Sequence, residues 1–158
     1  MIKNKGIFSR VVLLLLVLVF AQESHSQLRQ QQDFGVGLSI GEPTGLSARY
    51  NLDPVCAFDL GLSWSFINGG AFHVHGDYLY SILRVFDIEY RPVDLYFGLG
   101  ARAKFSNDLL LGARLPVGLS YTLASMPLEL FVELAGIFDL SPSTDFSFNG
   151  LIGARYYF

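Results

Sequence analysis

The sequence predicts an all-β protein, an eight-stranded antiparallel up-and-down transmembrane β-barrel that follows a cleaved N-terminal signal peptide. First, apolar residues after residue 21 recur at every second position, the period of a strand with one apolar face. Second, 51% of the 158 residues are hydrophobic and 16% are charged, against about 25% charged in a typical soluble domain. Third, no apolar run after residue 21 approaches the roughly 20 residues of a membrane-spanning helix. Apolar content delivered by alternation alone is typical of membrane barrels.

The first residues have the composition of a secretory signal peptide. Lys3, Lys5 and Arg10 form a basic front, and residues 11–20 form an apolar stretch that is too short for a stable membrane anchor. A second candidate cleavage site lies at 24–26. We therefore expect three segments: a signal peptide at 1–21 with cleavage as late as 26, a polar, glutamine-rich periplasmic lead-in at 22–32, and the barrel at 33–158.

The expected strands are separated by residues that favour turns. The first two form a hairpin around Pro43, and the third shows the clearest alternation. The segment 68–70 (NGG) is a strong tight-turn signal before the fourth strand. In chain order, the expected strands cover residues 34–40, 46–52, 58–66, 72–80, 95–105, 111–121, 128–140 and 146–158.

Two places fit this pattern less well. Residues 82–93 continue to alternate until Arg91-Pro92 breaks the run, so we expect an overlong strand end followed by a turn. Pro116 stands in the middle of the sixth strand, where its missing amide hydrogen removes a hydrogen bond between strands. We therefore expect a β-bulge at Pro116.

The last strand carries a resemblance. It ends in Phe158, with Tyr156 two positions earlier and apolar residues continuing at every second position. This resembles the carboxy-terminal signature of bacterial outer-membrane barrels, which the barrel-assembly machinery reads. The segments 41–50 (GEPTGLSARY) and 73–80 (HVHGDYLY) also resemble a family of small OmpA-like barrels. The resemblance implies an outer-membrane location and supplies no catalytic motif.

The face assigned outward carries no charged residue or histidine. One Arg or Lys at the bilayer midplane costs about 2–4 kcal/mol, so this absence indicates lipid outside. The same assignment gathers aromatic residues at both ends, as in the aromatic girdles of membrane barrels. The predicted girdle residues are Tyr50, Trp64, Phe66, Phe72, Tyr78, Tyr80, Phe105, Tyr121 and Phe138.

The inward face carries positive and negative side chains in near balance, and inward glycines leave room for the long ones. An eight-stranded barrel is just wide enough inside for side chains, so we expect a plug of ion pairs and hydrogen bonds. The alternative is a narrow, low-conductance channel for small solutes. The predicted lumenal polar network comprises Arg49, Asp59, His73, His75, Asp77, Arg102, Lys104, Arg114, Glu129, Glu133, Asp139 and Arg155.

We expect no metal, no cofactor and no catalytic residue. His73, His75 and Asp77 share one strand face and form a workable ligand set, but no third His or Cys is positioned by the sequence to close the site. Outer-membrane lipid hydrolases and acyltransferases need a His, Ser or acid at the rim or the lipid face, and the outward face has none. Cys56 is the only cysteine, which excludes an intrachain disulfide.

These observations predict an integral outer-membrane protein with a structural or interaction role, present as a monomer. Its expected partners are membrane lipid and, during biogenesis, the assembly machinery and periplasmic chaperones. The net charge of −3 argues against nucleic acid as a partner. Besides the channel, surface adhesion or host-protein binding is a third alternative, which the short outer loops disfavour.

Overall fold

A computed structural model of the chain describes residues 33–66, 70–88, 91–106, 108–123, 125–141 and 144–158. The expected signal peptide and lead-in lie outside these residues, as do parts of five expected connections between strands. Within the described ranges no helix is long and apolar enough to cross a bilayer.

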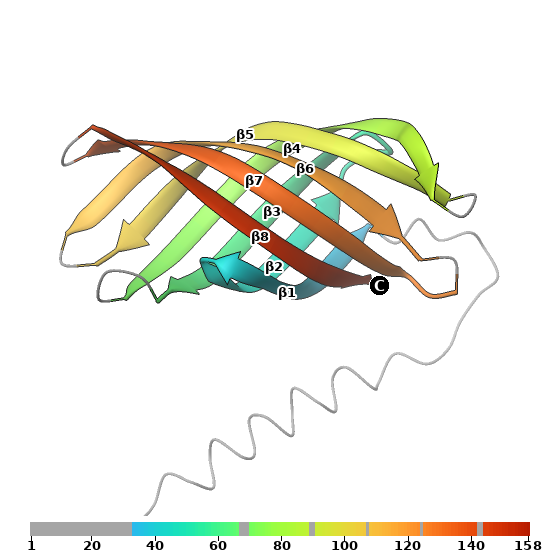
Figure 1. The fold of residues 1–158 in the computed structure, drawn as a ribbon, viewed down its shortest axis with the longest axis horizontal. Coiled ribbons are helices and arrows are strands. Elements are labelled where there is room, and N and C mark those ends of the chain that lie inside the picture. Colours follow the sequence, from blue (N-terminus) through green and yellow to red (C-terminus); the bar gives the residue numbers. More distant parts are fainter. Residues whose placement is uncertain (1–32, 67–69, 89–90, 107, 124, 142–143) are drawn as a thin grey trace, which may run out of the picture. The chain divides into compact units, whose positions relative to one another are not determined.

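The described residues form eight antiparallel strands that close into one barrel (Figure 1). Each strand pairs with the next one in sequence, and β1 pairs with β8 to close the cylinder. Closure leaves no unpaired strand edge, which a bilayer-spanning sheet requires. The predicted eight-stranded antiparallel up-and-down barrel is confirmed. The strands are β1 (Phe34–Glu42), β2 (Thr44–Asn51), β3 (Cys56–Ser65), β4 (Ala71–Ile88), β5 (Arg91–Phe105), β6 (Leu109–Thr122), β7 (Leu128–Ser141) and β8 (Asp145–Tyr157).

The two ends of the barrel differ in what they carry. One end, called the hairpin end below, carries the connections after β1, β3, β5 and β7. The opposite end, called the terminus end, carries Asp33 and Phe158, where the Phe158 amide donates to the Phe34 carbonyl at 2.9 Å. An even number of strands brings both termini to this end.

The expected overlong strand end is confirmed in β4, which is 18 residues long. The break expected at Arg91-Pro92 is wrong, because both residues belong to β5 and pair with Ile88 and Asp87. Its pairing with β5 changes register between Ile82 and Phe86. Arg84 lies in this irregularity with φ of 55°, and its amide donates to Asp94 Oδ1 at 2.7 Å. The Asp94 carboxylate therefore satisfies a backbone donor that the shifted ladder leaves without a strand partner.

The prediction of a β-bulge at Pro116 is wrong. The β5–β6 ladder is interrupted between the pairs Phe97/Val117 and Gly100/Arg114, but it resumes in the same register. The sheet thus tolerates the missing amide hydrogen by leaving out ladder pairs, without inserting an extra residue. The register shift of β6 lies instead on its other side, toward β7, between Leu111 and Gly112.

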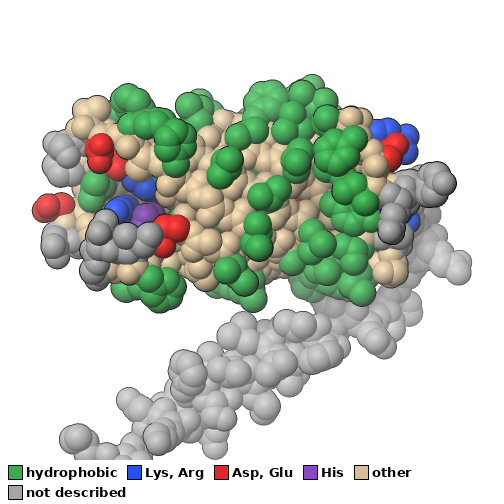
Figure 2. Space-filling view, viewed as in Figure 1, with side chains coloured by type: hydrophobic (Ala, Val, Ile, Leu, Met, Phe, Trp, Pro, Cys, Tyr) green, Lys and Arg blue, Asp and Glu red, His purple; other side chains and the backbone are tan. Residues whose placement is uncertain are grey.

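The two faces of the barrel wall are inverted relative to a water-soluble protein. Leu60, Leu99 and Leu134 point outward and are 60%, 62% and 61% exposed, whereas Arg114 and Arg155 point inward and are 1% and 2% exposed. Burying one large apolar side chain is worth about 1.5–3 kcal/mol in water, so a wall of exposed leucines fits an apolar surrounding. Figure 2 shows hydrophobic side chains spread over the visible side of the barrel wall.

Aromatic side chains gather on the outer face near both ends. The register places Phe34, Tyr50, Phe58 and Tyr78 side by side toward the terminus end, with the rings of Phe58 and Tyr78 5.3 Å apart. Trp64, Phe72 and Phe105 are likewise successive partners toward the hairpin end. Of the nine predicted girdle residues, Tyr121 is half-buried and the other eight are exposed.

Candidate functional site: the barrel lumen

The lumen holds the twelve residues predicted from the sequence to line it. Ten are buried, and His75 and Lys104 are half-buried. Five carry positive charge and five negative charge, because Lys104 and four arginines face five carboxylates. Buried charges persist only when they are paired and hydrogen-bonded, so the geometry of the pairs decides what this lumen can do.

A closed ring of two arginines and two acids occupies the lumen toward the terminus end. Arg49 pairs with Asp59 at 3.1 Å and with Glu129 at 3.3 Å. Arg155 pairs with the same two acids, at 2.6 Å to Asp59 and 2.8 Å to Glu129. Each charge therefore has two partners of opposite sign, and β2, β3, β7 and β8 are connected across the lumen.

Aromatic and hydroxyl groups complete this ring. The guanidinium of Arg155 lies 3.7 Å from the ring centroid of Phe131, and that of Arg49 lies 4.6 Å from the Tyr96 ring. Both distances fit cation–π contacts. Tyr157 donates its hydroxyl proton to Glu129 at 2.7 Å, and Ser47 Oγ accepts from Arg155 Nε at 2.8 Å.

A second group lies farther along the lumen and centres on Arg114 of β6. Its guanidinium bonds both Asp77 of β4 and Glu133 of β7. Tyr96 donates its hydroxyl proton to Glu133 Oε2 at 2.9 Å, and the guanidinium of Arg49 lies over the aromatic ring of the same tyrosine. Tyr96 therefore connects the Arg114 group to the ring of ion pairs. Arg114 thereby joins β4, β6 and β7 inside the lumen.

A third group, the ion pair of Arg102 with Asp139, lies on the side of the hairpin end. Arg102 Nη2 donates to both oxygens of Asp139, at 2.6 and 2.7 Å. These residues come from β5 and β7, which the glycine-containing part of β6 separates. A β-carbon built at Gly112 would lie 2.6 Å from Asp139 Oδ1, so the glycine makes room for the pair.

The histidines do not assemble a metal site with their neighbours. His75 Nε2 lies 3.9 Å from Asp77 Oδ2, and Arg114 already binds that oxygen. His73 is buried, and neither of its ring nitrogens has a hydrogen-bond partner. Among the described residues, no group of three or more His, Cys, Asp or Glu side chains is close enough to hold a metal ion.

Glycines on the inner face make this packing sterically possible. A β-carbon built at Gly100 would overlap Asp77 Oδ1, and one built at Gly118 would overlap the ring of Tyr96. A side chain at either position would displace a member of the Arg114 group. These glycines are therefore required by the close approach of a side chain from the neighbouring strand.

Little free space remains between the ring and the Arg114 group. A cavity of about 10 Å³ is lined by residues that include Ser47, Asp59, His75, Glu133 and Arg155. This is close to the smallest volume that holds one water molecule.

Sequence reasoning missed the uncharged members of the lumenal network. Tyr96, Tyr157 and Phe131 are 0%, 7% and 5% exposed and contact the buried charges. The alternation between Leu95 and Phe97 already places Tyr96 inward, and its hydroxyl marks it as a hydrogen-bonding member. Counting only charged residues and histidines on the inner face left these three out.

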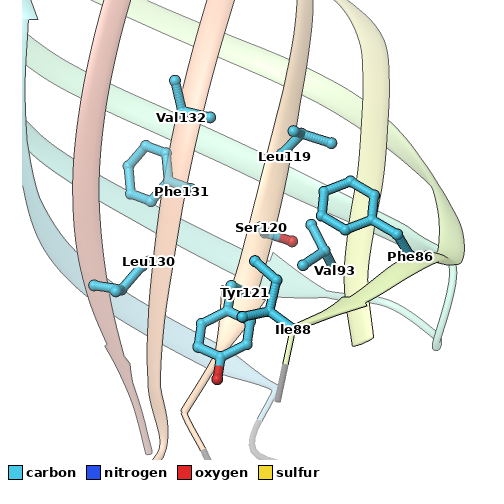
Figure 3. A pocket seen from close by; sticks show the side chains of 9 residues that line it. All are labelled: Phe86, Ile88, Val93, Leu119, Ser120, Tyr121, Leu130, Phe131 and Val132. Atoms are coloured by element: carbon cyan, nitrogen blue, oxygen red, sulfur yellow. The ribbon is translucent and has the colours of Figure 1, made fainter. Parts of the chain in front are cut away.

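A groove of about 300 Å³ lies on the outer wall (Figure 3). Its lining is almost entirely apolar and comes from β4, β5, β6 and β7. Val93 is 3% exposed within it, and Phe86 and Ile88 of the β4 extension lie on one side. The complete lining is Phe86, Ile88, Val93, Leu119, Ser120, Tyr121, Leu130, Phe131 and Val132.

No protein-family model matches the chain, and no curated protein matches it. A solved structure does: the crystal structure of Neisserial surface protein A (NspA) has a TM-score of 0.51 to this chain at 15% identity, covering 79% of this chain and 93% of NspA. The chain has the fold of a membrane β-barrel. At 15% identity this likeness shows the fold and nothing further. Membership of the OmpA-like family stays a prediction.

Proposed function

We propose that the protein is an integral outer-membrane barrel with a closed lumen, and that it has a structural or interaction role without transport or catalysis. The outer-membrane location is supported by the barrel likeness to NspA, by the apolar outer wall and by the terminal Phe158. Membrane lipid contacts the outer wall. Inside the lumen, the charged side chains pair with one another.

The observation that carries this proposal is the burial and double pairing of Arg114 inside the lumen. It is 1% exposed and bonds acids on two other strands. Removing one partner of a buried ion pair typically costs about 3–5 kcal/mol, so opening this barrier requires a large free-energy input. The cavity of about 10 Å³ beside it leaves no room for a hydrated solute.

The outer groove also fits a lipid surrounding. Leu130 and Val132, which line it, are each 44% exposed and continue the apolar wall. In a bilayer, acyl chains cover this surface without loss of hydrogen bonds. A catalytic role receives no support from the outer wall, where the polar groups of the groove are those of Ser120 and Tyr121.

Planar-bilayer recording tests the closed lumen. The refolded protein, whose folding is checked by its gel mobility with and without boiling, is expected to give no stable unitary currents. Arg102→Gln and Glu133→Gln are recorded in parallel, with Arg84→Gln as the control, because Arg84 lies in an exposed pair with Asp87. Stable currents in the unmodified protein that change in the two lumenal variants, and not in the control, would establish a channel and end the proposal.

A further inference from the structure

Polar groups without partners gather in the lumen toward the hairpin end. Seven buried side-chain atoms of the described residues have no hydrogen-bond partner, and four of them lie here: Ser63 Oγ, both ring nitrogens of His73, and Arg102 Nε. His73 is 3% exposed and Ser63 is 5% exposed. Each buried, unsatisfied polar group costs about 1–3 kcal/mol. The accumulation therefore indicates a partner that is not part of the chain.

The strand register places these groups around one space. Ser63 of β3 pairs with His73 of β4, which pairs with Lys104 of β5. The three side chains thus stand in one row across the inner wall. Arg102 lies two residues before Lys104 on the same face of β5. We call the part of the inner wall that carries Ser63, His73, Arg102 and Lys104 the His73 chamber.

Small side chains adjoin the His73 chamber. Next to Ser63 and His73 on the inner wall stand Ser65 and Ala71. Figure 2 shows histidine, basic and acidic side chains together at the end of the barrel that carries the β5–β6 and β7–β8 connections. The chamber thus lies between the hairpin end and the Arg114 barrier.

The lining offers hydrogen-bond donors and an uncompensated positive charge. The Asp139 carboxylate is bound on both oxygens by Arg102, which leaves Arg102 Nε as a further donor. Among the described residues no carboxylate lies within 4.0 Å of the half-buried Lys104 ammonium. The ammonium, the guanidinium N–H, the Ser63 hydroxyl and a ring N–H of His73 can all donate to one ligand.

We propose that the His73 chamber binds an oxyanion, a phosphate or sulfate group that is either free or carried by a larger molecule. Such a group accepts several charge-assisted hydrogen bonds at once, and so matches three donors beside one unpaired ammonium. The chamber is a blind binding site, because Arg114 closes the lumen behind it. This inference adds a ligand to the proposed function and does not require conduction.

Binding to the refolded full barrel tests the proposal by calorimetry, with inorganic phosphate, sulfate and glucosamine 6-phosphate as separate probes. NMR of the His73 ring nitrogens reports whether the probe reaches the chamber. Binding of all three probes shows that the chamber takes the oxyanion itself, and binding of the sugar phosphate alone shows that it takes a phosphorylated group; both results support the proposal. Each probe is added first at 10-fold the protein concentration and then at millimolar excess. If no probe gives binding heat or an NMR shift of His73 at either concentration, the proposal is overturned.

Variants then assign the site. Lys104→Gln is expected to weaken binding about 10-fold or more, because losing one hydrogen bond to a charged group lowers affinity by at least about this factor. Lys104→Arg should restore most of the affinity. Glu42→Gln, which removes a half-buried carboxylate at the same end, should strengthen oxyanion binding, and Arg84→Gln at the other end is the matched control. Equal affinity in Lys104→Gln and the control, or weaker binding in Glu42→Gln, would overturn the assignment; planar-bilayer currents test the closed lumen separately.

Discussion

Replacing Arg114 with methionine is the most informative perturbation of the lumen. Methionine keeps the unbranched stem of arginine as far as the position of Nε, while the guanidinium nitrogens that make both bonds and their charge are lost. The change leaves the carboxylates of Asp77 and Glu133, 3% and 4% exposed, without the arginine that bonds both. Removing one partner of a buried pair costs about 3–5 kcal/mol, so the expected loss in free energy of unfolding is of that size.

Urea unfolding in lipid vesicles measures this loss. Trp64 is the only tryptophan and is 47% exposed on the outer wall, so its fluorescence reports the exchange of lipid for water. The unboiled gel mobility gives an independent measure of the folded fraction. A triple variant that also carries Asp77→Asn and Glu133→Gln should recover much of the stability, because no unpaired charge remains.

The control is Arg84→Met. Arg84 pairs with Asp87 at 3.1 Å, but the two side chains are 66% and 45% exposed. Exposed pairs contribute about 0–1 kcal/mol, so this variant should unfold almost as the unmodified protein does. If Arg114→Met were no more destabilising than Arg84→Met, the lumenal ion pairs would not hold the barrel closed, and the reasoning above would be refuted.

Three further predictions concern the wall, the last strand and one turn. Leu134→Arg places a charge on the lipid face and should destabilise the barrel by about 2–4 kcal/mol, measured by the same urea titration; an effect below 1 kcal/mol would contradict lipid contact there. Deletion of Phe158 should leave the protein uninserted, as protease sensitivity in cells would show, and normal insertion would contradict the assembly signal. The backbone amides of Val55 and Cys56 donate to Asp53 and lower its pKa from the ordinary value; its contribution is therefore present above the ordinary pKa and is lost as pH falls through the lowered one. Asp53→Asn should flatten the dependence of stability on acid pH in that range, and an unchanged profile would count against the turn's role.

The alternation that predicted the strands also predicted which charged residues face inward. Arg49, Asp59 and Arg155 were assigned to the inner face from their sequence neighbours, and the structure places all three inside. The prediction of a bulge at Pro116 was wrong because a missing hydrogen bond can be accommodated by a gap in the ladder as well as by an extra residue. A single strand's sequence does not distinguish these outcomes, since the choice depends on the register of both neighbours.

The sequence by itself determined the faces of each strand, because a period of two is a property of the extended backbone. It also determined that the outer wall is apolar and that charges balance inside. Only the tertiary structure decided which charges meet. Arg155 and Asp59 are 96 residues apart in the chain, and they meet because closure of the barrel and the stagger of its strands bring β8 and β3 to the same height across the lumen. The same stagger sets Arg114 between Asp77 and Glu133 and leaves His73 without a partner.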